Sequence, residues 1–206
     1  MMRGSHENGD IFFQHREACN KYYEDLPEVV EKYMGKINEK LGTNYQLFNY
    51  YGAPDADRVI IAMGSVTEAA REAIDHLIAK GEKVGLVSVH LYRPFSAKHL
   101  LSALPESARA VAVLDRTKEP GAHAEPLYLD VMTALAEAFN NGERETLPRV
   151  IGGRYGLSSK EFGPDCVLAV FNELNEAKPK PRFTVGIYDD VTNLSLALPE
   201  NTLPSN

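Results

Sequence analysis

The chain has 206 residues and a mass of 22.8 kDa, and its 22 Lys and Arg against 29 Asp and Glu give a net charge of −7. Hydrophobic residues make up 44% and charged residues 25%, values that are typical of a folded globular protein and argue against a mainly disordered chain. A pI near 5.4 without a basic stripe argues against a nucleic-acid partner, and no apolar run approaches the roughly 20 residues that a membrane helix needs.

The first 42 residues predict an arm of two helices. We expect Asp10 to cap the first helix and the two helices to be separated by a break at residues 25–27, which end in a proline. The second helix is expected to stop at Gly42 in the left-handed conformation. Its apolar side chains share one face, namely Val30, Tyr33, Met34, Ile37 and Leu41. The arm is rich in aromatic residues and is expected to pack against something larger than itself.

Residues 43–190 alternate short apolar runs with amphipathic segments. The spacing of Ser65 and Glu68 predicts a capping box at the start of one helix, and Pro164 is expected to open the last helix. Strands are expected at residues 45–51, 58–63, 83–89, 110–114, 149–151 and 183–187. This alternation predicts an α/β fold with three αβα layers around a mostly parallel sheet of about five strands. Residues 191–206 are polar and proline-rich and are expected to form a linker.

In a sheet of this kind, function usually sits beyond the carboxyl ends of the strands. The candidate contact residues at those positions are Gly64, Ser65, Arg93, Arg116, Lys118, Gly153 and Arg154. Each also has a plainer interpretation. The spacing of a phosphate loop is absent, so Gly64 is expected mainly to permit a turn. Arg154 is expected to pair with a carboxylate, and the charged loop that starts at Arg116 is expected to contact a partner or solvent.

Neither a metal site nor a catalytic residue is predicted. The six histidines show no ligand spacing, and the two cysteines, Cys19 and Cys166, are too few for a disulfide framework or a four-thiolate metal site. We expect Cys166 to be modestly reactive, because a helix N-terminus lowers the pKa of a thiol. The adjacent pair Asp189 and Asp190 is expected to form a turn. The expected compartment is a reducing cytoplasm, and the polar N-terminus lacks the apolar core of a secretory signal.

Seven stretches of the chain, taken in order, resemble pyruvate:ferredoxin (flavodoxin) oxidoreductase. Among them are Leu47-Phe-Asn-Tyr-Tyr-Gly-Ala-Pro-Asp-Ala56 and Val113-Leu-Asp-Arg-Thr-Lys-Glu-Pro-Gly121. The full set is residues 11–19, 47–56, 61–65, 91–96, 113–121, 151–160 and 183–192. The part that they resemble is the second domain of that enzyme, whose fold is similar to the C-terminal domain of transketolase. By the same resemblance, residues 1–42 are similar to the end of the preceding thiamine-pyrimidine domain with its connection, and residues 191–206 to the start of the third domain.

The resemblance implies an enzyme that converts pyruvate and coenzyme A to acetyl-CoA and CO2. It implies thiamine diphosphate, Mg and [4Fe-4S] clusters as cofactors, ferredoxin or flavodoxin as electron acceptor, and a homodimer. The family's diphosphate signature, Gly-Asp-Gly followed by Asn, and its cysteine-rich cluster motifs are missing here. The chain is therefore expected to be an excised segment without catalytic residues or cofactors of its own, and its doubled initial Met fits an added initiator. Its expected role is scaffold and interdomain or dimer contact, and the isolated chain is expected to be inactive.

Other functions stay open from the sequence. One is a module that binds the anionic groups of coenzyme A or thiamine diphosphate through Arg116, Lys118 and Arg154. Another is a separately encoded subunit of a split 2-oxoacid:ferredoxin oxidoreductase, with the aromatic arm as its assembly surface. An unrelated nucleotide-binding α/β protein is a remote further alternative, because a fold does not fix a function.

Overall fold

A computed structural model describes residues 7–189 and 191–200 of the chain. The chain divides into two compact units. The arm unit comprises Met1–Leu47 and Leu91–Ser96, and the sheet unit comprises Phe48–His90 and Ala97–Asn206. The doubled Met, Asp190 of the acidic pair and the last six residues of the predicted linker lie outside the described residues.

The arm unit contains two helices, α1 (Gly9–Ala18) and α2 (Asn20–Leu41). The predicted break at residues 25–27 is wrong, because the helices meet at Cys19 and Pro27 lies inside α2. A proline in a helix interior removes one backbone hydrogen bond, but the ring of Pro27 is buried, and this burial offsets part of the loss. The N-cap of α1 is Asn8 and not Asp10, and its side chain makes no capping hydrogen bond.

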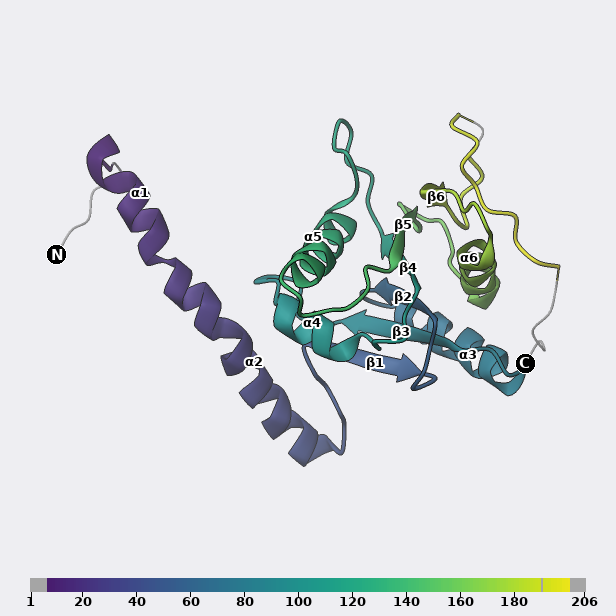
Figure 1. Cartoon of the computed structure of the whole chain (residues 1–206), viewed down its shortest axis with the longest axis horizontal. Helices are drawn as coiled ribbons and strands as arrows, with labels where there is room; N and C mark the ends of the chain where they lie inside the picture. Colours follow the sequence, from purple (N-terminus) through teal and green to yellow (C-terminus); the bar gives the residue numbers. More distant parts are fainter. Residues whose placement is uncertain (1–6, 190, 201–206) are drawn as a thin grey trace. The chain divides into compact units, whose positions relative to one another are not determined.

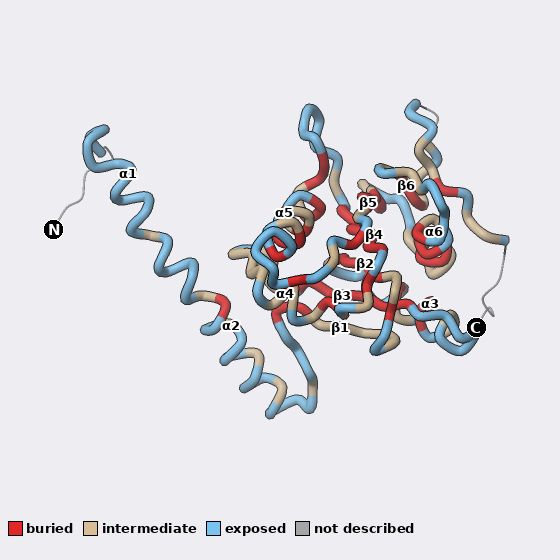
Figure 2. The backbone as a smooth tube through the Cα atoms, viewed as in Figure 1, coloured by how far each residue is buried: buried red, intermediate tan, exposed pale blue. Residues whose placement is uncertain are grey.

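The end of α2 is as predicted, since Gly42 adopts the left-handed conformation with φ 67°. The side chain of Asn38 fixes the following chain by accepting from the Tyr45 N–H at 2.7 Å and donating to the Tyr45 carbonyl at 2.9 Å. Both helices are exposed over most of their length (Figure 2). The exposed large apolar side chains of the arm unit are Ile11, Phe12, Phe13, Tyr22, Tyr23, Val29, Tyr33, Ile37, Leu41 and Tyr45. None of the described helices is long and apolar enough to cross a membrane.

The sheet unit is built on a six-stranded sheet with the order β1-β3-β2-β4-β5-β6 (Figure 1). Its strands are β1 (Phe48–Gly52), β2 (Arg58–Ala62), β3 (Val84–Val89), β4 (Ala110–Asp115), β5 (Arg149–Arg154) and β6 (Arg182–Thr184). The edge strand β1 pairs antiparallel with β3, and all the other neighbours are parallel. The predicted mostly parallel α/β sheet is thus confirmed, with six strands where about five were expected.

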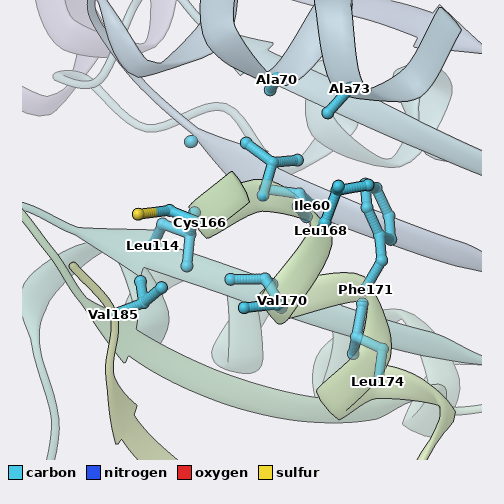
Figure 3. Packing of buried hydrophobic residues seen from close by; sticks show 14 of the residues in the cluster. Ile60, Ala70, Ala73, Leu114, Cys166, Leu168, Val170, Phe171, Leu174 and Val185 are labelled. Atoms are coloured by element: carbon cyan, nitrogen blue, oxygen red, sulfur yellow. The ribbon is translucent and has the colours of Figure 1, made fainter. Parts of the chain in front are cut away.

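Helices cover both faces of this sheet, which gives the three predicted layers. They are α3 (Val66–Ala79), α4 (Ala97–Ala103), α5 (Pro126–Asn140) and α6 (Pro164–Asn175). In Figure 1, α3 and α6 lie on one face, and α4 and α5 lie on the other. The core under α6 is shown in Figure 3, where Leu168 and Phe171 point toward Ile60 of β2 and toward the small residues Ala70 and Ala73 of α3. Small side chains on α3 allow α6 to pack closely.

The start of α3 differs from the predicted capping box. Ser65 has helical dihedrals of φ −61° and ψ −23°, and its side chain makes no capping hydrogen bond. The turn depends instead on Gly64, whose φ of 80° an L side chain rarely adopts. The hydroxyl of Thr67 donates to the Gly64 carbonyl at 2.8 Å and fixes the first turn.

Part of the predicted linker packs against the last strand. The Thr184 N–H donates to the Leu194 carbonyl at 3.1 Å, and the Leu196 N–H donates to the Thr184 carbonyl at 2.8 Å. The side chain of Leu196 is buried in the same core as α6. The turn before it is closed by Asp189, whose carboxylate accepts from the backbone N–H groups of Val191 at 3.0 Å and Thr192 at 2.9 Å.

We predict that Gly153→Ala destabilises the sheet unit by about 1–3 kcal/mol, because overpacking of a dense core costs this much. A methyl group on Gly153 would overlap the ring of Phe183 and a methyl group of Leu114. The measurement is urea unfolding followed by circular dichroism. The matched control is Gly35→Ala in α2, where nothing lies within 4 Å of the added methyl group. Equal unfolding midpoints for the two variants would contradict the packing argument.

Asp189 also gives a pH prediction. Hydrogen bonds, first from the Thr192 hydroxyl and then from backbone N–H groups, lower the pKa of Asp189 from 3.8 to about 2. A carboxyl with a lowered pKa stabilises its turn above its ordinary pKa, and this contribution is lost as the pH falls from about 4 to about 2. Carboxyl NMR titration should show that Thr192→Val raises this pKa toward 3.8. Val191→Ala keeps its N–H and should leave the pKa of Asp189 near about 2; an equal rise in both variants contradicts the assignment.

Candidate functional site

The carboxyl ends of β2, β4 and β5 lie side by side, because these strands are neighbours and parallel. The chain leaves β2 into α3 on one face of the sheet, and it leaves β4 toward α5 on the other face (Figure 1). This divergence makes the gap between the two strand ends a topological switch point, the position where ligands bind in open α/β sheets. We call this region the strand-end edge and define it as residues 63–66, 115–118, 125 and 154–162.

Asp115, the last residue of β4, joins the sheet to α5. Its side-chain oxygens accept from the backbone N–H of Leu127 at 2.9 Å and of Tyr128 at 3.1 Å. These are orphan donors of the first turn of α5, whose own N-cap residue Glu125 makes no capping hydrogen bond. Burial raises the pKa of Asp115, although the two N–H donors act in the opposite direction. Asp115 therefore serves as a cap supplied from a neighbouring strand.

Glu125 lies close to two of the candidate contact residues, Lys118 and Arg154. One of its carboxylate oxygens lies 3.8 Å from Nη1 of Arg154 and 3.8 Å from Nζ of Lys118. The side chains of Glu125 and Arg154 are only 5% and 12% exposed, whereas that of Lys118 is 46% exposed. The predicted pairing of Arg154 with a carboxylate is thus present, and the partner is a residue that the sequence did not single out.

Arg116 contacts the segment that follows β5 and forms no ion pair with Glu125 among the described residues. A Cβ atom at Gly156 would lie 2.7 Å from Nε of Arg116, so the guanidinium stem packs where only a glycine leaves room. Gly156 has a φ of 71°, which also favours glycine. Nη2 of Arg116 donates to the Ser158 carbonyl at 3.3 Å. The guanidinium is therefore positioned by backbone and lacks a carboxylate partner among the described residues.

Arg116 lines a pocket of about 160 Å³ at the strand-end edge. The other polar residues of its wall are Ser65, Tyr155 and Lys160, and Gly156 and Phe162 complete the side next to β5. The hydroxyl of Tyr155 donates to the Met63 carbonyl at 3.3 Å, and its ring meets that of Phe162 edge-on at 5.0 Å. The hydrogen bond connects the ends of β2 and β5 across β4.

The remaining candidate residues serve local structure. Gly153 is packed between Phe183 and Leu114, so its backbone is not open to a ligand. Arg93 belongs to the arm unit, where its guanidinium lies 3.9 Å from the ring centroid of Tyr92 and donates to the Tyr92 hydroxyl at 2.9 Å.

The expectation of a reactive Cys166 is wrong. Its side chain is buried, and burial raises the pKa of the thiol. Within the described residues there is also no group of three or more His, Cys, Asp or Glu side chains that could hold a metal ion.

Residues 56–156 match the family model described as pyruvate:ferredoxin oxidoreductase core domain II. These residues belong to that family. The chain is 70% identical over 206 residues to a protein of Escherichia coli strain K12 named "Probable pyruvate-flavodoxin oxidoreductase". It is 53% identical over 199 residues to the pyruvate:ferredoxin oxidoreductase of Moorella thermoacetica.

The match covers 100% of this chain but 18% of the Escherichia coli protein, and 97% of this chain but 16% of the Moorella protein. The chain therefore spans less than a fifth of the length of these relatives. Among solved structures, a 2-oxoglutarate:ferredoxin oxidoreductase from Magnetococcus marinus covers 70% of this chain with 22% identity and a TM-score of 0.41, and the match spans 22% of that protein.

We predict that Glu125→Gln destabilises the sheet unit by about 3 kcal/mol, because removing one partner leaves the buried guanidinium of Arg154 uncompensated. Thermal and urea unfolding measure the change. The matched control is Glu119→Gln, which removes the same charge from an exposed position of the same loop and should change stability by less than about 0.5 kcal/mol. If Glu125→Gln had the same free energy of unfolding as Glu119→Gln, the stabilising role of the ion pair between Glu125 and Arg154 would be contradicted.

Proposed function

We propose that this chain is a structural, non-catalytic domain of a pyruvate:ferredoxin or pyruvate:flavodoxin oxidoreductase, the enzyme that converts pyruvate and coenzyme A to acetyl-CoA and CO2. The observation that carries the proposal is the 70% identity over the complete chain to one segment of a much longer relative. Similarity of this extent along one continuous segment supports the same place in a similar polypeptide. The excised domain is then residues 43–190, between an arm of residues 1–42 and a linker of residues 191–206.

The chemistry of the strand-end edge supports a scaffold role. Its two buried carboxylates are engaged within the fold, since Asp115 caps α5 and Glu125 pairs with Arg154. The thiol of Cys166 is buried with a raised pKa, which disfavours the thiolate needed for nucleophilic attack. Carboxylates that already cap a helix or form a buried ion pair are poor candidates for proton transfer. We therefore assign the chemistry of pyruvate to other domains.

The cofactors of the proposed parent enzyme do not fit the residues of this chain. A [4Fe-4S] cluster needs four thiolates, and the sequence has two cysteines. A Mg²⁺ that accompanies thiamine diphosphate needs several oxygen ligands, and the described residues contain no cluster of three metal-binding side chains. We therefore place thiamine diphosphate, Mg²⁺ and the clusters, together with the ferredoxin or flavodoxin contact, on other parts of the polypeptide.

The arm unit supports a role in interdomain or dimer contact. Its described residues include ten exposed large apolar side chains, among them Phe12, Phe13 and Tyr22 with exposed fractions of 54%, 66% and 75%. Apolar surface of this kind marks contact with another protein surface. We propose that other domains of the same polypeptide cover it within a cytoplasmic homodimer.

The size and activity of the native polypeptide test this function. An antibody raised against the chain should detect, in lysate of the source cells, a band far larger than 22.8 kDa. The purified 206-residue chain should reduce no viologen dye with pyruvate and coenzyme A, whereas the long polypeptide should do so. A native band near 22.8 kDa would favour a separately encoded subunit, and turnover by the isolated chain would overturn the non-catalytic assignment.

A further inference from the structure

We propose that the pocket at the strand-end edge binds a phosphate group, which Arg116 and Lys160 hold at the N-terminus of α3. The proposal concerns a ligand of this domain itself and does not depend on the activity of the longer enzyme. It rests on the charge of the pocket, on the way Arg116 is positioned and on the place of the pocket in the sheet.

The pocket has an excess of positive charge. Arg116 and Lys160 both line it, and no carboxylate is among the described residues of its wall. Neither cation forms an ion pair within the described part of the chain, in contrast to Lys118 and Arg154, which share Glu125. A doubly charged oxyanion would match these two cations, and phosphate carries about −1.5 to −2 charges at neutral pH.

Uncharged donors lie beside these cations. Ser65 lines the pocket with a hydroxyl that makes no capping hydrogen bond, and Val66 begins α3, a helix of 14 residues. The backbone N–H groups of Thr67 and Glu68 already donate to the carbonyls of Gly64 at 3.1 Å and Ser65 at 3.2 Å, so this end of α3 acts on an anion mainly through the positive end of the helix dipole. The pocket thus offers a guanidinium, an ammonium, a hydroxyl and the positive end of a helix to the same small volume.

Arg116 is exposed, but two contacts within the fold position it before any ligand binds. The absence of a Cβ atom at Gly156 lets the guanidinium stem lie against the backbone, and the Ser158 carbonyl accepts one of its N–H groups. The planar guanidinium has five N–H donors, so the remaining ones can bind two oxygens of a phosphate. Pre-positioning of this kind lowers the entropic cost of binding.

The volume and position of the pocket fit a small oxyanion. About 160 Å³ is far more than the 10–15 Å³ that one water needs, yet it is too small for a whole nucleotide cofactor. The pocket also opens at the topological switch point between β2 and β4, where ligands bind in sheets of this kind. A terminal phosphate or a free phosphate would fit, with any larger group left outside.

The test is titration of the ¹⁵N-labelled 206-residue chain with sodium phosphate, pyrophosphate or coenzyme A, each at constant ionic strength. We expect saturable amide shifts at Ser65, Val66 and Gly156, with a dissociation constant of about 1 mM or lower. Arg116→Ala and Lys160→Ala should each weaken binding about tenfold, since each removes a charge-assisted contact. The control Lys178→Ala removes an exposed charge outside the pocket and should leave binding unchanged.

The three titrants separate the sources of the phosphate group. Tighter binding of coenzyme A than of pyrophosphate identifies a cofactor-borne phosphate, and the reverse order identifies a free anion; either result supports the site. Linear shifts without saturation overturn the proposal, as does equal weakening by Lys178→Ala. Arg116→Ala removes a packed side chain, so Lys160→Ala serves as the second variant if the first one unfolds.

Discussion

The arrangement of the strand-end edge depends on one buried carboxylate, that of Asp115. It ends the central strand β4 and accepts from two backbone N–H groups in the first turn of α5. These bonds hold the first turn of α5 next to the end of β4. Residues 116–125 therefore form a loop that begins and ends at the strand-end edge. The residues at the two ends of this loop then face different neighbours: Arg116 lies against Gly156, and Glu125 lies against Arg154.

The sequence predicted the sheet well, because its central strands are nearly continuous apolar runs that resemble few other elements. Residues 58–62, 84–89 and 110–115 are buried strands as expected. The sequence did not predict which distant strands pair with each other, for example the antiparallel pairing of the edge strand β1 with β3. The arm shows the limit of local rules, since Pro27 indicated a break but lies inside a continuous helix. The burial of the Pro27 ring depends on the folded chain, so it could not be predicted from the local sequence.

For the site, the sequence identified charged residues at the strand ends, but it could not tell which of them form ion pairs and which line the pocket. In the alternative of a binding module, Arg116, Lys118 and Arg154 would act together, yet the structure divides them between Glu125 and the pocket. Glu125 lies 29 positions before Arg154, so their pairing is a consequence of how β4 and β5 align. Lys160 carried no signal at all, because a lysine in a polar loop is usually solvated. Side-chain direction at a strand end decides which charges meet, and it follows from tertiary packing.

This division of charge has a consequence for a domain that functions inside a larger polypeptide. Ion pairs such as Glu125 with Arg154 can be covered by another domain at little further cost, because each charge already has a partner. Arg116 and Lys160 have none among the described residues, and burying two unpaired cations is strongly unfavourable. An oxyanion in the pocket would remove this penalty and would supply oxygens to which a covering domain can donate hydrogen bonds. Phosphate binding and interdomain contact at this edge would then reinforce each other, since each lowers the desolvation cost of the other.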